Sequence, residues 1–345
     1  MRKSVSAIGL LSLLFVFGAK AEAELNLASM DWSVKAPHNL AKEPPSRKVV
    51  EEFLQLGDDN ANSPSLCSFT FADLRRNGTL TLLYASDSSG RGFCNEIEMV
   101  DRTGATFELS NLDTSEAFGD GDDVRKLVKD LDNNGHLELV VAMLIGGYQG
   151  RVYCTLEWPV IFAWTGGDYT DVSRQFNWFY RQRLAVLQSQ LNEPPTTRGP
   201  EGEIEVFSSE SPSVEAQVIK RRSASTSALS SETFDSDCTR ANAAKTERFL
   251  GISREAGMDD AIRWSDSDDP LQREFAATVF DDIGTPEALA HLKNLASDSD
   301  PSIAVVAKDH LRFRAVNAPP ATIYRFDTIP CQLKARSLSC DDSAH

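Results

Sequence analysis

Hydrophobic and polar positions follow two different rhythms along the chain. Between residues 66 and 173, short β-type runs alternate with turn residues, which predicts antiparallel strands. From residue 240 onward the apolar positions recur at helical spacing. The predicted strands are 66–71, 80–85, 96–101, 105–109, 124–130, 137–144, 159–164 and 168–173. The predicted helices are 240–250, 255–264, 270–281, 286–296 and 301–313. We therefore expect an α+β protein with more than one domain.

The strand region contains an internal duplication. Asp73–Leu80 (DLRRNGTL) aligns with Asp130–Leu137 (DLDNNGHL) at an offset of 57 residues, and each half carries four of the predicted strands. Four antiparallel strands per unit are typical of a propeller blade or a small meander sheet. We predict two packed four-stranded, blade-like sheets over residues 65–173, with their edges covered by the helices that follow.

The second copy of the repeat contains a candidate metal loop. Four oxygen-bearing side chains stand at positions 1, 3, 5 and 9 of this loop: Asp130, Asp132, Asn134 and Glu138. The backbone carbonyl of His136 is available at position 7, and alternate residues of a loop that coils around a cation point inward, which suits Ca²⁺. Val141 stands at position 12, where an EF-hand has its bidentate glutamate. The other interpretation is a plain hairpin turn, because Asn-Gly between hydrophobic runs is by itself a hairpin signal.

The first copy lacks this set of ligands. It keeps Asp73 and Asn77, but Arg75 and Thr81 replace the other two carboxylates. A guanidinium beside Asp73 could take the place of an ion. We predict that the first copy binds no metal, because too few negative charges remain.

The two loops and their flanking strands resemble FG-GAP/VCBS repeats, the blade units of integrin-type β-propellers. The resemblance covers residues 65–173, about a third of the chain. It implies a structural calcium site in the second repeat. Two units are too few to close the ring of an integrin propeller.

Other segments complete the predicted domain organisation. Residues 24–64 contain prolines and one apolar cluster, so we expect an extended arm that could carry one helical turn. Residues 174–192 are predicted to form an amphipathic helix that ends before Pro194. Residues 193–238 are rich in Ser, Thr, Pro and Glu, which predicts a disordered, flexible linker. Residues 316–345 are expected to be a C-terminal tail.

A second duplication lies among the predicted helices of residues 239–315. Ser265–Pro270 (SDSDDP) recurs as Ser297–Pro301 (SDSDP), with 31 residues from proline to proline. Asp-Pro before a helix supplies an N-cap and a preset φ, and a period near 30 is typical of a short α-solenoid. The stretch Asp269–Leu289 resembles the HEAT repeats of phycobilin lyases. That resemblance implies a helical repeat that binds proteins.

The N-terminus and the cysteines indicate export. Residues 1–23 combine Arg2 and Lys3, an apolar run and small residues at a cleavage site, which predicts a cleaved signal peptide and a secreted or periplasmic protein. No later stretch is long and apolar enough for membrane insertion. An even number of cysteines in an oxidising compartment predicts disulfides. The six cysteines are Cys67, Cys94, Cys154, Cys238, Cys331 and Cys340. Fifteen pairings are possible, of which we favour Cys331–Cys340 and Cys94–Cys154.

Charge and motifs narrow the function. The formal charge of −16 disfavours a nucleic-acid partner, and no HExxH, GxSxG or P-loop motif is present. The acidic residues Asp120, Asp122 and Asp123 either add to the ion site or form a solvated loop. We expect an exported protein-interaction module that is not an enzyme, with a partner that the sequence does not identify. The alternative is a secreted enzyme, either a hydrolase that uses the loop around Asp130 or a lyase-like protein.

Overall fold

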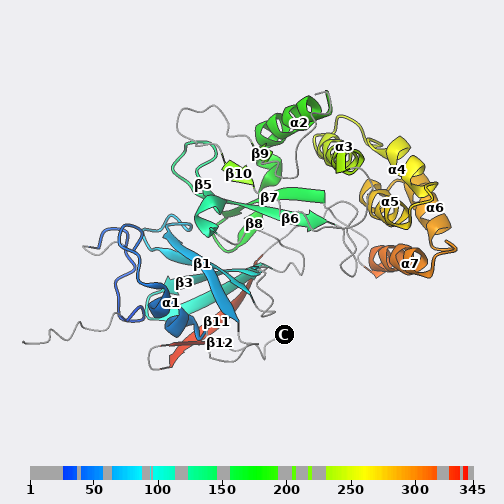
Figure 1. Ribbon diagram of the computed structural model, residues 1–345. Coiled ribbons are helices and arrows are strands. Elements are labelled where there is room, and N and C mark those ends of the chain that lie inside the picture. Colours follow the sequence, from blue (N-terminus) through cyan, green and yellow to red (C-terminus); the bar gives the residue numbers. More distant parts are fainter. Residues whose placement is uncertain are drawn as a thin grey trace, which may run out of the picture.

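The computed structural model describes residues 26–36, 40–56, 64–87, 94, 96–112, 123–145, 156–192, 204–206, 217–219, 231–316, 326–334 and 337–340. In these ranges the chain forms an α+β protein with two main antiparallel sheets and a stack of helices (Figure 1). None of the described helices combines the length and apolar character needed to cross a bilayer. The predicted signal peptide, residues 1–23, lies outside the described residues.

The first sheet curls into a half-barrel (Figure 1). Its strands, in spatial order, are β1 (Ser65–Ala72), β2 (Thr81–Asp87), β3 (Glu96–Thr103), β4 (Thr106–Leu112), β11 (Phe326–Lys334) and β12 (Ser337–Cys340). We expected a tail where β11 and β12 lie, and this expectation is wrong. β11 pairs with β4 from Phe326↔Leu112 to Cys331↔Phe107, so the C-terminal part of the chain completes an N-terminal sheet.

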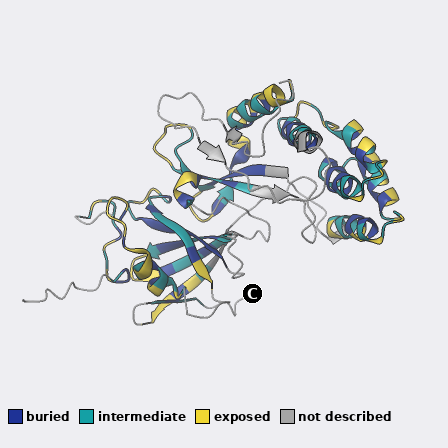
Figure 2. Ribbon diagram, viewed as in Figure 1, coloured by how far each residue is buried: buried dark blue, intermediate teal, exposed yellow. Residues whose placement is uncertain are grey.

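Strand β2 is buried along its whole length, because both faces of the sheet are covered (Figure 2). Leu83 and Ala85 belong to the core that the first sheet shares with the second. Leu82 and Tyr84 point the other way, into a separate core inside the half-barrel. Alternate residues of a strand face opposite sides, and here both sides are apolar.

The N-terminal segment fills the half-barrel, although we expected an extended arm. Trp32 lies with its ring centre 5.5 Å from those of Phe71 and Phe107, and its indole N–H donates to the carbonyl of Leu27 at 2.9 Å. The short helix α1 (Arg47–Leu54) adds Phe53 to the same cluster. Burying these large side chains offsets the cost of ordering the segment.

The second sheet has the predicted four-stranded meander, with strands β5 (Val128–Lys129), β6 (Glu138–Ile145), β7 (Leu156–Trp164) and β8 (Tyr169–Asp171). It is not a copy of the first sheet. A 3₁₀ turn, η1 (Val124–Leu127), takes the place of most of the predicted strand 124–130, so that β5 retains two residues. A second 3₁₀ turn, η2 (Ser173–Gln175), follows β8.

The helices stack beside the second sheet (Figure 1). They are α2 (Asn177–Asn192), α3 (Ser231–Phe249), α4 (Met258–Ser265), α5 (Pro270–Ile283), α6 (Pro286–Leu295) and α7 (Pro301–Val316). Helix α3 packs on α2 and begins inside the segment for which we predicted a linker. That segment also contains the short antiparallel pair β9 (Ile204–Val206) and β10 (Gln217–Ile219). Helices α3, α5 and α7 form one layer of the stack, and α4 and α6 form the other.

Aromatic side chains join the helices to the second sheet. Trp158 of β7 stacks on Tyr180 of α2 with ring centres 5.0 Å apart. Phe249 at the end of α3 packs on both rings, at 5.0 Å and 4.3 Å. Helix α2 and the end of α3 therefore share the apolar core of the second sheet, whereas α4 to α7 pack around a separate core.

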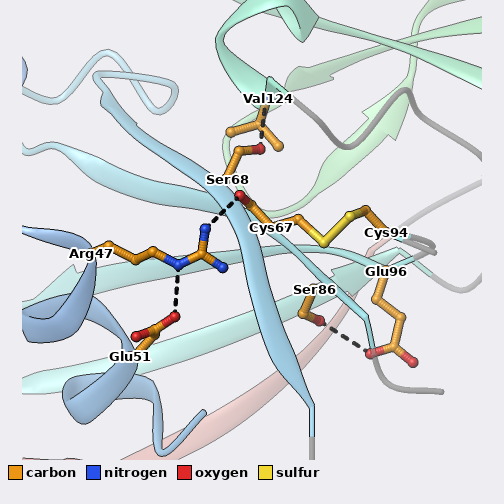
Figure 3. Close-up of a disulfide and its surroundings, with 8 residues drawn as sticks. All are labelled: Arg47, Glu51, Cys67, Ser68, Ser86, Cys94, Glu96 and Val124. Atoms are coloured by element: carbon orange, nitrogen blue, oxygen red, sulfur yellow. Dashed lines mark hydrogen bonds and ion pairs between the residues drawn. A yellow bond between two sulfur atoms is a disulfide. The ribbon is translucent and has the colours of Figure 1, made fainter. Parts of the chain in front are cut away.

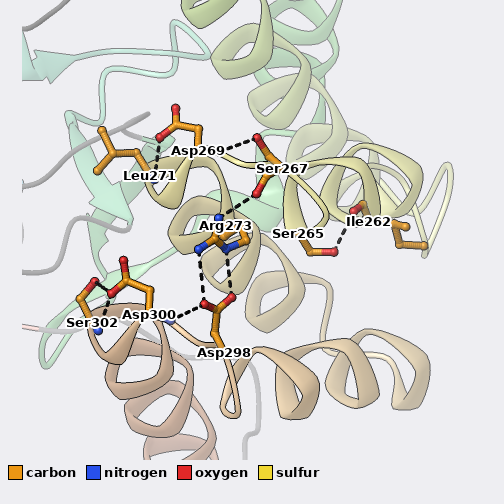
Figure 4. A network of polar contacts seen from close by, with 9 residues as sticks. All are labelled: Ile262, Ser265, Ser267, Asp269, Leu271, Arg273, Asp298, Asp300 and Ser302. Atoms are coloured by element: carbon orange, nitrogen blue, oxygen red, sulfur yellow. Dashed lines mark hydrogen bonds and ion pairs between the residues drawn. The ribbon is translucent and has the colours of Figure 1, made fainter.

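The duplicated Asp-Pro turns have the same hydrogen bonds (Figure 4). The Asp269 carboxylate accepts the N–H of Leu271 at 3.0 Å, and the Asp300 carboxylate accepts the N–H of Ser302 at 2.9 Å. Arg273 of α5 then pairs with Asp298 of the second turn at 3.0 Å, which ties the two repeats together. The two copies of this motif therefore form equivalent helix starts.

The disulfides correct one expectation and confirm another. Cys67 of β1 pairs with Cys94 (Figure 3), so the expected Cys94–Cys154 bond is wrong. Cys67 lies where the β1–β2 register shifts, at the end of the sheet where β3 begins. Cys331 pairs with Cys340 across β11 and β12 as predicted. Cys238 is also disulfide-bonded.

Candidate metal site

The loop between β5 and β6 is a tight turn built on one aspartate. The Asp130 carboxylate accepts the N–H groups of Asn134 and Gly135, each at 3.0 Å. Asn133 has φ 55° and Gly135 has φ 80°, so both occupy the left-handed region that Asn and Gly tolerate. The residue types therefore match the backbone that the turn requires.

The loop of the first repeat has the same turn. The Asp73 carboxylate accepts the N–H groups of Asn77 and Gly78, each at 3.1 Å. Arg76 has φ 51° and Gly78 has φ 78°. These positions match those of the second loop at the offset of 57 residues. The first loop keeps only one of the three carboxylates, so the turn does not depend on the acidic cluster of the second.

Three carboxylates converge in the second loop alone. One oxygen from each of Asp130, Asp132 and Glu138 lies within 4.8 Å of the other two. Glu138 is the first residue of β6 and is 3% exposed, with Leu131 donating its N–H to Oε2 at 2.9 Å. Burial raises the pKa of Glu138, and the negative charges of Asp132 and Asp130 raise it further against the effect of the Leu131 N–H.

These residues fit a hard divalent cation. Each carboxylate oxygen can accept two hydrogen bonds or ligand contacts, so the backbone N–H groups leave lone pairs on Asp130 and Glu138 for an ion. A cation among the three would also offset their mutual repulsion. The set is all oxygen, which is the preference of Ca²⁺ and Mg²⁺ rather than Zn²⁺. Such an ion would neutralise and order the loop.

The side chains of the other two predicted residues, Asn134 and His136, have partners of their own. Asn134 donates its side-chain N–H to Asp132 at 2.8 Å, and its Oδ1 accepts the N–H of His136 at 2.6 Å. The His136 ring contacts the Arg76 guanidinium of the first loop. The structure therefore brings together the three carboxylates, and the hydrogen bonds of Asn134 lie within the turn beside them.

Arg76 also places the two loops side by side. Its Nη2 lies 3.5 Å from the backbone oxygen of Asn134. Aligning the two repeats could not have predicted this contact. Arg76 is equivalent to Asn133 in the second repeat, whereas it contacts Asn134 and His136.

The first loop replaces the cluster with a buried ion pair, but not the one that we expected. Arg75 pairs with Asp101 of β3 at 2.7 Å and with Glu108 of β4 at 3.1 Å, rather than with Asp73. Thr81 donates its hydroxyl to the same Asp101 carboxylate. Burial raises the pKa of Asp101, and Arg75 and Thr81 only partly counteract the rise.

The Arg75 guanidinium also reaches the second sheet. Its Cζ lies 4.2 Å from the ring centre of Trp164 and 6.0 Å from that of Tyr169. A guanidinium over an aromatic face is attracted to it. Arg75 therefore links an ion pair of the first sheet to the aromatic end of the second.

The acidic residues before β5 do not join the cluster as far as they are described. Asp123 pairs with Arg125 at 2.7 Å and caps η1. The hydrogen bond from the Arg125 side chain holds the pKa of Asp123 below its ordinary value. Asp120 and Asp122 lie outside the described residues.

Comparisons of this chain with protein-family models, curated proteins and solved structures found no match.

Proposed function

We propose that this chain is an exported protein-interaction module whose second β loop binds a structural calcium ion. One observation carries the ion: Asp130, Asp132 and Glu138 converge within 4.8 Å, on a turn that the first repeat forms with a single carboxylate. Since the turn forms without the cluster, the extra carboxylates are explained by a bound cation. The resemblance of the two loop sequences to FG-GAP/VCBS repeats also supports a calcium site.

Calcium suits this loop better than other metals. The cluster has no thiolate, and the one imidazole of the loop lies against Arg76, so a zinc site is disfavoured. Magnesium requires near-ideal octahedral geometry, whereas calcium accepts the irregular oxygen sets of flexible loops. Sites in extracellular modules bind calcium at about 10⁻⁴ to 10⁻³ M. The disulfides and the leader-like N-terminus support an exported location.

The interaction role rests on the helical part of the molecule. Its helices repeat in sequence and in turn geometry, as in solenoids that present extended binding surfaces. The β module supports these helices through the cluster of Trp158, Tyr180 and Phe249. The calcium ion would then brace the β module that supports the binding surface.

Thermal unfolding with millimolar calcium, and then with a chelator, tests the ion. Calcium at about ten times its dissociation constant stabilises the fold by roughly 1.4 kcal/mol, which raises the melting temperature. Asp132→Ala removes this gain, because Asp132 joins the cluster, while Asp130 stays in place to accept the N–H groups of Asn134 and Gly135. Asp73→Ala in the first loop is the control and keeps the calcium response. Equal wild-type melting temperatures in both conditions would leave the loop as a plain turn.

Capture from a secreted or periplasmic fraction tests the interaction role. The full chain without its leader should retain a specific partner in stoichiometric amount. Turnover of a substrate panel with no retained protein would favour the enzyme alternative.

A further inference from the structure

Ion pairs connect the inner layer of helices. They join α3 to α5 and α5 to α7: Lys245 and Arg248 with Asp282, and Asp281 with His310 and Arg314. Burial by itself would raise the pKa of Asp282, but Lys245 and Arg248 outweigh it and hold that pKa below the ordinary value. Each interface in this layer therefore pairs a carboxylate of α5 with basic side chains of its neighbour.

Helix α7 is the last helix of the layer, and one side of it faces away from α5 (Figure 1). His310 and Arg314 point towards α5, since both pair with Asp281. Arg312 follows His310 by two positions, or about 200° around a helix, so it points away from α5. Val305 precedes Arg312 by seven positions and lies on the same side.

Exposed apolar residues lie on this outward side and at its edge, where Phe313 follows Val305 by eight positions, or about 80° around the helix. Val305 is 46% exposed and Phe313 is 60% exposed, among the most exposed large apolar side chains of the described residues. Lys308 and Arg312 flank them, and Asp309 is partly buried beside them. We call these five residues the terminal face. Two of its residues are apolar, and the two basic residues and one aspartate give it a net charge of about +1.

Two features of the terminal face indicate what covers it. The last repeat of a solenoid normally has a polar outer surface, whereas this one keeps Val305 and Phe313 exposed. The face also continues the α3–α5–α7 series, in which Arg314 of α7 pairs with the Asp281 carboxylate of the neighbouring helix. A helix packed against the outward side of α7 would therefore complement it if that helix carried apolar residues and carboxylates.

We propose that the terminal face docks an acidic amphipathic helix of a partner protein. This inference rests on the proposed interaction function and names the surface and the class of partner. A second copy of the chain fits less well, because two terminal faces would bring Lys308 and Arg312 of each copy together. Burial of Val305 and Phe313 supplies affinity, and the two cations select the charge of the partner.

Binding of a labelled synthetic peptide to the full chain tests the proposal. The peptide has about 18 residues, long enough to form a helix on its own, with leucines at helical spacing and glutamates beside them. A matched peptide has lysine in place of each glutamate. The wild type should bind the acidic peptide more tightly than the lysine peptide, and this affinity should fall with added salt.

Variants of the chain locate the site. The double variant Val305→Ser, Phe313→Ser should bind the acidic peptide at least about tenfold more weakly than the wild type does, a loss of about 1.4 kcal/mol. Lys308→Glu with Arg312→Glu should reverse the preference between the two peptides. Ile252→Ser is the control, since Ile252 is 62% exposed on the α3–α4 connection and is not part of the terminal face. This control should bind like the wild type.

Several results would overturn the proposal. They are no binding of the acidic peptide by the wild type, equal binding of the two peptides, or unchanged affinity in the serine variant. Self-association in sedimentation that the serine substitutions abolish would assign the face to a second copy instead. A native partner captured equally by the wild type and the serine variant would preserve the proposed function and remove this surface from it.

Discussion

The loops Asp73–Leu80 and Asp130–Leu137 share one backbone and differ in charge. In each, an aspartate accepts two backbone N–H groups, and two residues occupy the left-handed region. The third residue of the loop is Arg75 in the first repeat and Asp132 in the second. The Arg75 side chain is only 10% exposed, whereas Asp132 is exposed.

This difference separates the turn from the chemistry that it carries. The aspartate at position 1 and the Asn-Gly pair determine the turn, and positions 3 and 9 determine its charge. In the first repeat those positions hold Arg75 and Thr81, and both contact Asp101 inside the protein. In the second repeat they hold carboxylates that suit an external cation. One repeat therefore fastens the sheets together, while the other is available for an ion.

Removing Arg75 should have the largest effect on stability. Arg75→Met leaves the buried Asp101 carboxylate without its cation, which costs about 3–5 kcal/mol. Urea unfolding measures this loss as a lower midpoint. Adding Asp101→Asn to the same chain should recover part of the loss, because the unpaired buried charge is then gone. Arg76→Met is the control and should cost less than about 1 kcal/mol, since Arg76 is exposed. Equal losses at Arg75 and Arg76 would contradict the buried role of Arg75.

Removing the first aspartate of each loop should separate the turn from the ion. In chelator, Asp73→Ala and Asp130→Ala should each cost about 1–2 kcal/mol, because each loses two charge-assisted hydrogen bonds. In calcium at about ten times its dissociation constant, Asp130→Ala should fall a further 1.4 kcal/mol or so below Asp73→Ala. Chemical unfolding in the two buffers measures this gap. Its absence would mean that Asp130 serves the turn alone.

Replacing the glycine of each loop should cause the smallest loss of stability, and the two losses should be the most similar of any pair. Gly78 and Gly135 have φ of 78° and 80°, and an added Cβ would have no heavy atom closer than 3.9 Å at either position. Alanine at either position therefore costs only backbone strain, about 1 kcal/mol. Melting curves of Gly78→Ala and Gly135→Ala in chelator should nearly coincide. Clearly unequal losses would show that the two turns are not equivalent.

Local patterns predicted much of this molecule. Most strands of the two repeats, with the exception of the predicted strand 124–130, match the sequence expectations. The Asp-Pro helix starts and the Cys331–Cys340 bond match as well, because each of these features depends on residues close together in the chain. The three clustered carboxylates were also predicted, since a turn of known type sets which of its residues point inward.

The predictions that failed concern contacts between distant residues. The N-terminal segment fills the half-barrel, β11 pairs with β4, and Cys67 pairs with Cys94. Hydrophobic spacing can indicate a strand or a helix, but it does not identify the partner of that element. Both repeats also have similar strand patterns, yet only the first sheet gains two strands from the C-terminal part of the chain.

The sequence by itself determined the two turns and the charge that each carries. Asp, Asn and Gly at fixed spacing satisfy the backbone of the turn whatever surrounds it. Only the tertiary structure decided which partners those charged side chains contact. Arg75 turns inward because the packing of the two sheets places Asp101, Glu108 and Trp164 around it. A long charged side chain adopts the position in which neighbouring groups can pair with its charge. Here those groups come from different strands, and the spacing of residues along the chain does not show which strands lie next to each other.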